Sequence, residues 1–144
     1  MDSQQIVANG WHAEIPAEWE DRSMITLVGE TDRNGFAANI VVTREKAASG
    51  TKIEDYARRQ AEMMRAEIGE LQIIDERAIE IKGSAGYQRL QRFAANGLSV
   101  QQVQTFILAG GVIYAITGTS SVEAFDLAIP AFKQFVETFR PNSQ

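Results

Sequence analysis

The stretch of sequence that decides the fold is YQRLQRFAANGLSVQQVQTFILA, residues 87–109. Its two halves, Tyr87–Ala94 and Leu98–Ala109, are predicted strands rich in β-branched and aromatic residues. The Asn96-Gly97 pair between them is a strong short-range signal for a tight hairpin. The sequence therefore predicts an antiparallel sheet built outward from this hairpin.

Further strands are predicted on both sides of the hairpin, bounded by glycine, proline, asparagine and aspartate. Gly110-Gly111 turns the chain into the next strand, and Gly83 and Gly86 are expected to bracket the preceding turn. The other predicted strands are Gly10–Ile15, Ser23–Val28, Ala38–Arg44, Leu71–Ile81 and Val112–Thr119.

The first predicted helix has signals at both ends. Thr51 and Glu54 have the spacing of a capping box, helical residues run to Ile68, and Gly69 stands where a glycine cap belongs.

A second helix is predicted from a capping box at Ser120 and Glu123 to Phe139, and Pro130 should kink or break it, giving a short helix followed by another that starts near Pro130. The element order βββ-α-ββββ-α predicts one α+β domain over residues 1–144. We expect an antiparallel sheet of six to seven strands, one long helix and a proline-broken C-terminal helix.

Composition excludes several classes of function. The chain has 144 residues, a net charge of −5, no cysteine and one histidine. An acidic balance argues against nucleic-acid binding, and the lack of cysteine excludes disulfides and thiolate metal sites. No apolar segment of residues 1–20 has the form of a signal peptide, and the longest stretch without charged or strongly polar residues, 106–116, is too short to span a membrane. We therefore expect a cytoplasmic protein that does not insert into membranes.

Motifs with known chemistry are weak or missing. Ser49-Gly50-Thr51-Lys52 matches S-x-x-K without its partner motifs, and no phosphate-binding glycine loop occurs. Asp75 and Glu76 are adjacent on a predicted strand and so point to opposite faces, and His12 is expected at a surface or edge. No cofactor, metal or catalytic group is predicted, and an enzyme is the least favoured class.

Glutamines interrupt the expected apolar pattern of the central hairpin. On the second strand, Val100, Gln102, Gln104 and Phe106 share one face with Leu108, mixing amide and apolar side chains. One interpretation is an ordinary solvated sheet face. The other is a recognition surface, because glutamine offers a donor and an acceptor without the desolvation cost of a charge.

A second interruption lies on the first helix. Gln60 falls in the apolar row that contains Met64 and Ile68. It either marks the edge of the row or bonds inside the core, or it is a polar anchor in a groove that binds a partner. The predicted strand 23–28 adds a partly apolar face with Met24 and Thr26.

Three sets of residues together resemble a known family. They are Ile15-Pro16-x-x-Trp19-x-Asp21-x-Ser23, Asp55-Tyr56-x-x-x-Gln60, and Gln104 in the glutamine-rich strand. Their spacing over residues 6–140 resembles the DcrB-related family, and more closely the effector-associated (Eag-type) chaperones of bacterial type VI secretion.

The resemblance implies a PsbP-like fold, usually homodimeric, and a function. Such chaperones bind the N-terminal transmembrane helices of a PAAR-containing effector and shield them in the cytoplasm before loading onto the secretion spike. The implied client contacts fall on Met24, Thr26, Gln60, Met64, Ile68, Val100, Gln102 and Gln104. At Thr26 a larger aliphatic residue is typical of the family. The alternative is a DcrB-like accessory protein of the cell envelope without enzymatic activity.

Overall fold

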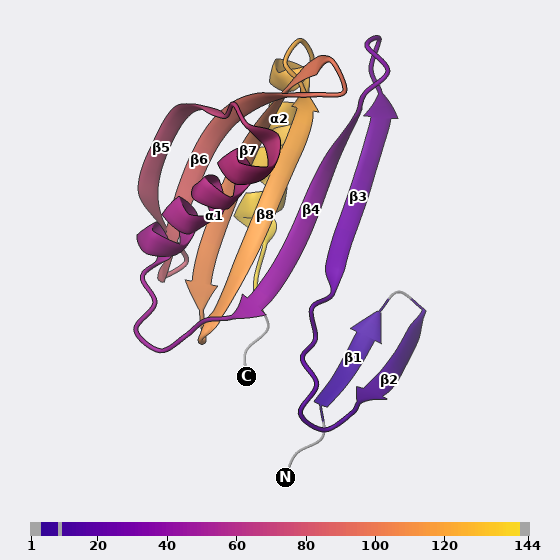
Figure 1. Ribbon diagram of the computed structural model, residues 1–144. Helices are drawn as coiled ribbons and strands as arrows, with labels where there is room; N and C mark the ends of the chain where they lie inside the picture. Colours follow the sequence, from indigo (N-terminus) through magenta and orange to yellow (C-terminus); the bar gives the residue numbers. More distant parts are fainter. Residues whose placement is uncertain (1–3, 9, 142–144) are drawn as a thin grey trace.

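A computed structural model describes residues 4–8 and 10–141 of the chain (Figure 1). The fold is α+β, as predicted. Its elements, in chain order, are β1 (Gln4–Ala8), β2 (Trp11–Ile15), β3 (Met24–Thr31), β4 (Ala37–Lys46), α1 (Ile53–Ile68), β5 (Gln72–Ile81), β6 (Ser84–Ala95), β7 (Leu98–Ala109), β8 (Val112–Ser121) and α2 (Phe125–Thr138).

Six strands form one antiparallel sheet in the order β3-β4-β8-β7-β6-β5. The central hairpin is the predicted one, with Ala95 paired to Leu98 across the turn. Asn96 and Gly97 have φ angles of 52° and 78°, the left-handed backbone that a two-residue hairpin turn requires. Because β4 pairs with β8, the first half of the sheet adds to the edge of the meander formed by β5 to β8.

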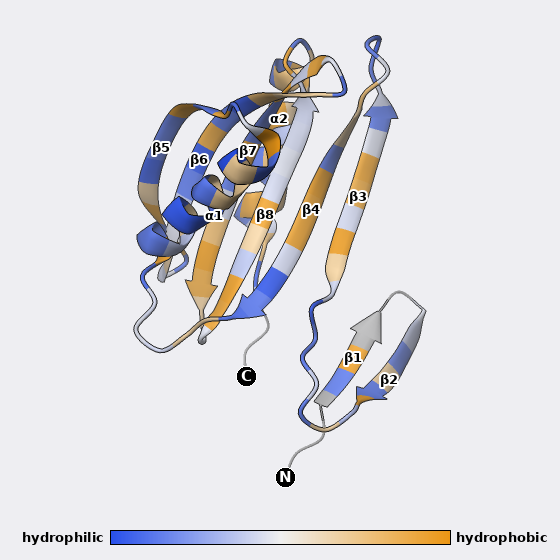
Figure 2. Cartoon of the chain, in the orientation of Figure 1, coloured by the Kyte–Doolittle hydropathy of each residue, from blue (hydrophilic) through white to orange (hydrophobic). Residues whose placement is uncertain are grey.

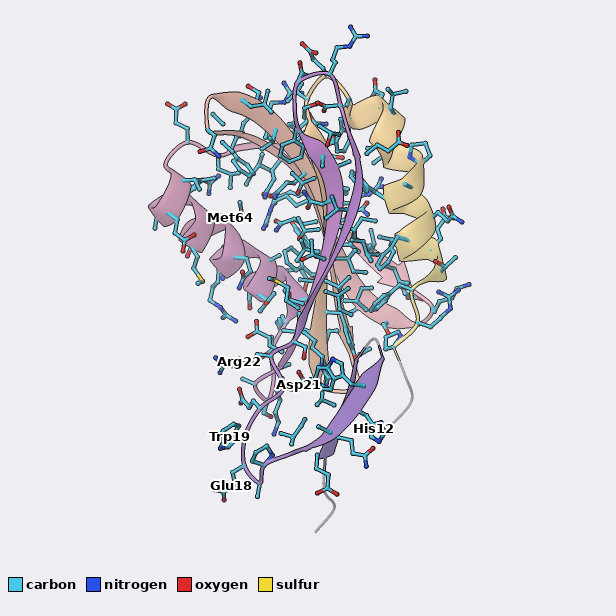
Figure 3. All side chains as sticks on the ribbon, turned by 90° about the vertical axis from the view of Figure 1, so that its right-hand side faces the viewer. His12, Glu18, Trp19, Asp21, Arg22 and Met64 are labelled. Carbon is cyan, nitrogen blue, oxygen red and sulfur yellow. The ribbon has the colours of Figure 1, made fainter. Side chains whose placement is uncertain are left out.

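The two helices cover opposite faces of this sheet (Figure 3). On one face α1 buries Ile53 and Ala57 against Phe106 and Ile113. On the other face Phe132 of α2 lies directly on the sheet at Gly118. A Cβ atom at Gly118 would lie 2.6 Å from the Phe132 ring, so only glycine permits this approach of α2.

The start of α1 differs from the prediction, while its end agrees. The Thr51 hydroxyl donates to the Ala48 carbonyl at 2.6 Å and therefore closes the preceding turn. Lys52 is the N-cap residue and makes no side-chain cap. Gly69 adopts the predicted glycine cap, with φ 80° and its N–H 3.0 Å from the Arg65 carbonyl.

The predicted break in the C-terminal helix is wrong. Helix α2 runs without interruption through Pro130. Proline removes one helical hydrogen bond, to the carbonyl of Asp126, and both residues are exposed, so water can replace that bond. The capping box is also wrong, because Ser120 still belongs to β8 and it is the Ser121 hydroxyl that accepts the Ala124 N–H, at 3.3 Å.

Gly86 lies inside strand β6 rather than at a turn. The β5–β6 turn is formed by Lys82 and Gly83, both with positive φ. A Cβ atom at Gly86 would lie 3.0 Å from the Phe106 carbonyl oxygen and 3.1 Å from Ile79 Cγ1. Gly86 therefore serves close packing between neighbouring strands.

Strands β1 and β2 form a separate two-stranded sheet, which Figure 1 shows apart from the main sheet. The sequence predicted only its second strand. His12 of β2 is exposed, as expected, and Figure 3 shows it and Trp19 well away from both helices. Trp11 and Trp19 are 54% and 69% exposed. Within the described ranges, no helix has the length and apolar character needed to cross a membrane.

Candidate functional site

Helix α1 covers only half of its face of the sheet. It packs on β6, β7 and the start of β8, and Figure 1 shows β4, β3 and part of β8 beside it rather than beneath it. We call this uncovered surface the open face. It consists of Met24, Thr26 and Val28 of β3, Asn39, Val41 and Thr43 of β4, and Thr117 of β8, which the strand register places on the α1 side of the sheet.

The outer strand of the open face is apolar and exposed. Met24 and Val28 are 63% and 67% exposed, although both belong to a regular strand. On the other side of β3, Ile25 and Leu27 are also exposed, and Figure 2 shows apolar bands along β3 and β4. Since β3 is an edge strand with apolar residues on both faces, it has the properties of an interaction surface.

The strand register brings two of the predicted residues onto one line across the sheet. Gln104 pairs with Thr117, Thr117 with Val41, and Val41 with Thr26. Two strand spacings separate β8 from β3, which is about 10 Å. An α-helix with its side chains is about 10–12 Å across, so the open face has the width of one helix lying beside α1.

The predicted residues of α1 lie at the edge of its buried row. Tyr56 donates its hydroxyl to the Glu45 carboxylate of β4, which turns this flank of α1 toward the open face. Gln60 follows one turn later and is half-buried, as is Met64, which lies on the sheet side of α1 (Figure 3). Ile68 is 38% exposed. The edge interpretation of Gln60 therefore agrees with its half-buried position on α1.

Beneath α1 the glutamines form a hydrogen-bonded network around a buried arginine. Arg89 is 1% exposed. Its Nε donates to Gln91 Oε1 at 3.0 Å, and its Nη2 donates to Gln104 Oε1 at 3.1 Å. Its Nη1 donates to the Ala57 carbonyl at 2.8 Å, which ties the sheet to α1. The guanidinium also lies 5.5 Å from the centre of the Phe106 ring.

The second branch of the network runs from Gln91 toward β8. Gln91 Nε2 donates to Gln102 Oε1 at 2.7 Å and to Met64 Sδ at 3.2 Å. Gln102 Nε2 then donates to Thr119 Oγ1 at 3.0 Å. Gln91 is fully buried. The glutamine face of the hairpin is thus neither solvated nor wholly free, because α1 covers much of it.

The structure separates the predicted site residues into two groups. The first group has Met24 and Thr26 on the open face, Gln104 on the same row on β7, and Gln60, Met64 and Ile68 on α1. Val100 is 1% exposed and belongs to the core, so its side chain is unavailable for a contact. Gln102 has both ends of its amide engaged inside the protein.

Arg89 is the residue that sequence reasoning missed. It is the single charged side chain between Tyr87 and Gln91 on the inward face of β6. The signal was present, because an inward charge on a central strand must be hydrogen-bonded to be tolerated. Burial lowers the pKa of Arg89, although guanidinium stays protonated at any ordinary pH.

Other potential sites carry little chemistry. In residues 4–8 and 10–141 no group of three His, Cys, Asp or Glu side chains is placed to hold a metal ion. A cavity of about 410 Å³ lies away from the open face, between the β5–β6 turn and the end of α2, and its lining includes Ile107, Tyr114 and Phe139. The open face is a sheet surface beside a helix rather than an enclosed pocket.

Comparison with known proteins identifies the family. The family model DcrB matches residues 12–138. The chain belongs to the DcrB family. No protein among those with curated functions matches this DcrB-family protein.

Three solved structures share the fold of this DcrB-family protein. PA94 from Pseudomonas aeruginosa, a protein of unknown function, is similar with a TM-score of 0.85 and 21% identity, covering 99% of both chains. CyanoP, the PsbP of Synechocystis sp. PCC 6803, is similar with a TM-score of 0.62 and 13% identity, covering 97% of this chain and 92% of CyanoP. LpqN of Mycobacterium tuberculosis, involved in cell envelope biogenesis, is similar with a TM-score of 0.59 and 11% identity, covering 95% of this chain and 89% of LpqN. The fold is PsbP-like, as predicted.

Proposed function

We propose that this DcrB-family protein is a chaperone that shields an apolar α-helix on its open face. The client is the N-terminal transmembrane region of an effector of bacterial type VI secretion, as the resemblance of its motifs to Eag-type chaperones implies. The helix lies beside α1, on the uncovered part of β3, β4 and β8. The exposed apolar edge strand β3 is the observation that carries this proposal.

The dimensions of the open face suit such a client. Strand β3 has 8 residues and α1 has 16, which correspond to about 27 Å and 24 Å. A transmembrane helix of about 20 residues is about 30 Å long. A single helix would therefore be covered along most of its length, between α1 on one side and β3 on the other.

Apolar burial supplies most of the affinity in this proposal. Met24 and Val28 are each about two-thirds exposed, and fully burying such a side chain contributes about 1.5–3 kcal/mol. Each therefore contributes roughly 1–2 kcal/mol when a helix covers it. Gln60 and Gln104 add hydrogen bonds at about 0.5–1.5 kcal/mol each.

A second copy of the chain is part of the proposal. Among the described strands, the β1–β2 hairpin pairs with no strand of the main sheet, and an isolated two-stranded hairpin is marginally stable in water. It also exposes Trp11, and Trp19 follows in the segment leading to β3. We infer that this arm packs on the second protomer of a homodimer. Light scattering should give twice the chain mass, and Trp11→Ser should shift the protein toward monomer.

Co-expression tests the function. The transmembrane segment of a type VI effector, produced with this protein, should stay in the soluble fraction and co-elute with it at a fixed ratio. Thr26→Asp places a charge in the middle of the open face and should return the segment to the pellet. Leu127→Asp is the matched control, because Leu127 is 86% exposed on α2, on the other side of the sheet. The proposal would be refuted if the segment stayed soluble with Thr26→Asp as well as with Leu127→Asp. It would also be refuted if neither the wild type nor Leu127→Asp kept the segment soluble.

A further inference from the structure

The amide network has a direction, because its centre is an arginine. Guanidinium has five N–H donors and no acceptor, so only an amide oxygen can face it. The Oε1 atoms of Gln91 and Gln104 are therefore turned toward Arg89. The amide nitrogens of Gln91 and Gln104 therefore point away from Arg89. Without the arginine, nothing would require this orientation of the amides.

The two branches of the network end differently. On one branch the Gln91 amide nitrogen donates to the Gln102 oxygen, and the Gln102 amide nitrogen donates to the Thr119 hydroxyl oxygen, where this chain of donors ends. On the other branch Gln104 is half-buried and sits on the row that continues through Thr117 onto the open face. Within the described part of the chain, no acceptor is found for Gln104 Nε2.

We propose that Arg89 is a positioning residue that fixes Gln104 with its amide donor toward the open face, so that this surface selects helices carrying hydrogen-bond acceptors. The inference rests on the proposed function and specifies its client chemistry. Suitable acceptors are the backbone carbonyls bared beside small residues and the hydroxyl oxygens of serine and threonine, which recur on transmembrane helices that pack closely. A uniform leucine helix offers neither on its surface.

The burial of Arg89 supports a role beyond simple stabilisation. Across the described residues no carboxylate lies within ion-pair distance of its guanidinium, and its three hydrogen-bond partners are neutral. The carboxylate of Glu76, directly opposite Arg89 on β5, acts on it only from beyond that distance. A buried charge with no carboxylate in contact is costly, and an apolar side chain would fill the same space at lower cost. What an apolar residue could not do is hold the Gln104 amide in one orientation.

Two synthetic peptides test the inference. Each is a 22-residue leucine–alanine helix with flanking lysines. One carries O-methylserine at its centre and the other carries norvaline, which has the same shape but a methylene in place of the ether oxygen. The ether oxygen accepts hydrogen bonds and cannot donate them. The measured quantity is the ratio of the two dissociation constants for each protein variant.

In the wild type the ratio should favour the ether peptide by about 3- to 10-fold more than in Gln104→Met, which removes the donor. Arg89→Met frees the amide, and its ratio should fall to within about twofold of that of Gln104→Met. Gln104→Glu keeps Arg89 in place through an ion pair but presents no donor, so its ratio should fall at least as far. Gln88→Met is the matched control on the opposite face of β6, where Gln88 bonds Thr105, and it should keep the wild-type ratio.

The outcomes separate the inference from the function. If the wild type binds both peptides and Gln104→Met keeps the wild-type ratio, donor selection is wrong while the chaperone proposal stands. A folded Arg89→Met with the wild-type ratio would overturn the role of Arg89. If Arg89→Met does not fold, a wild-type ratio in Gln104→Glu would overturn that role, because this variant has no amide donor for Arg89 to orient. Failure of the wild type to bind either peptide would refute the proposed function, and the inference with it.

Discussion

Replacing Met24 by serine should weaken client binding without unfolding the protein. Met24 is 63% exposed, so the fold depends little on its side chain. Full burial of a methionine side chain contributes about 1.5–3 kcal/mol, and about two-thirds of that remains to be gained on binding. The loss is therefore roughly 1–2 kcal/mol, which corresponds to a dissociation constant about 5- to 30-fold higher.

The neighbouring Ile25 is the matched control for this substitution. It is 58% exposed on the same strand but points to the other face of the sheet. With a lysine-flanked apolar helix peptide titrated by fluorescence anisotropy, Met24→Ser should raise the dissociation constant and Ile25→Ser should leave it within about twofold. An equal loss in both variants, or no loss in Met24→Ser, would show that the client does not lie on the open face.

Two further predictions concern the fold that supports this surface. Gly118→Ala forces a methyl group into the Phe132 ring and should lower the free energy of unfolding, measured in urea, by about 1–3 kcal/mol. In the control Gly29→Ala the new methyl group meets its nearest atom at an ordinary 3.4 Å, so the free energy of unfolding should hardly change. Equal stabilities of the two variants would contradict the packing of α2. The hydrogen bond from the Ser121 hydroxyl holds the pKa of Asp32 below its ordinary value of 3.8. The ionised carboxylate therefore stabilises the fold above pH 3.8, and this stabilisation is lost as the pH falls through the lower pKa of the folded state. Asp32→Asn should therefore be less stable at pH 7 and lose less stability on acidification, and parallel pH–stability curves would contradict this.

The central hairpin could be predicted because its information is local. Asn96-Gly97 determines the turn, and the period-2 pattern on either side determines which residues share a face. The order of chain elements and the Gly69 cap are local in the same sense. Strand β1, which was missed, and the uninterrupted helix α2 are not determined locally. Pairing with β2 overrides the weak local signal of β1, and packing on the sheet overrides the contrary signal of Pro130 in α2.

The candidate site was predictable in part for a similar reason. Alternation along β7 correctly placed Gln102 and Gln104 on one face, yet it could not show that α1 would cover that face. Val100 follows the same alternation and is buried at the far end of the strand. Whether an inward side chain reaches a partner depends on where the helix crosses the sheet, and that depends on the small residues Ala57 and Ala61 far away in the sequence.

Photo-crosslinking tests the central claim most directly. A benzoylphenylalanine at Thr26, which lies on the open face across from Gln104, should crosslink to a bound transmembrane peptide on irradiation. The same residue at Leu127 on α2 should not. Strong crosslinking from Leu127 with none from Thr26 would mean that the client, if any, is held on the other side of the sheet.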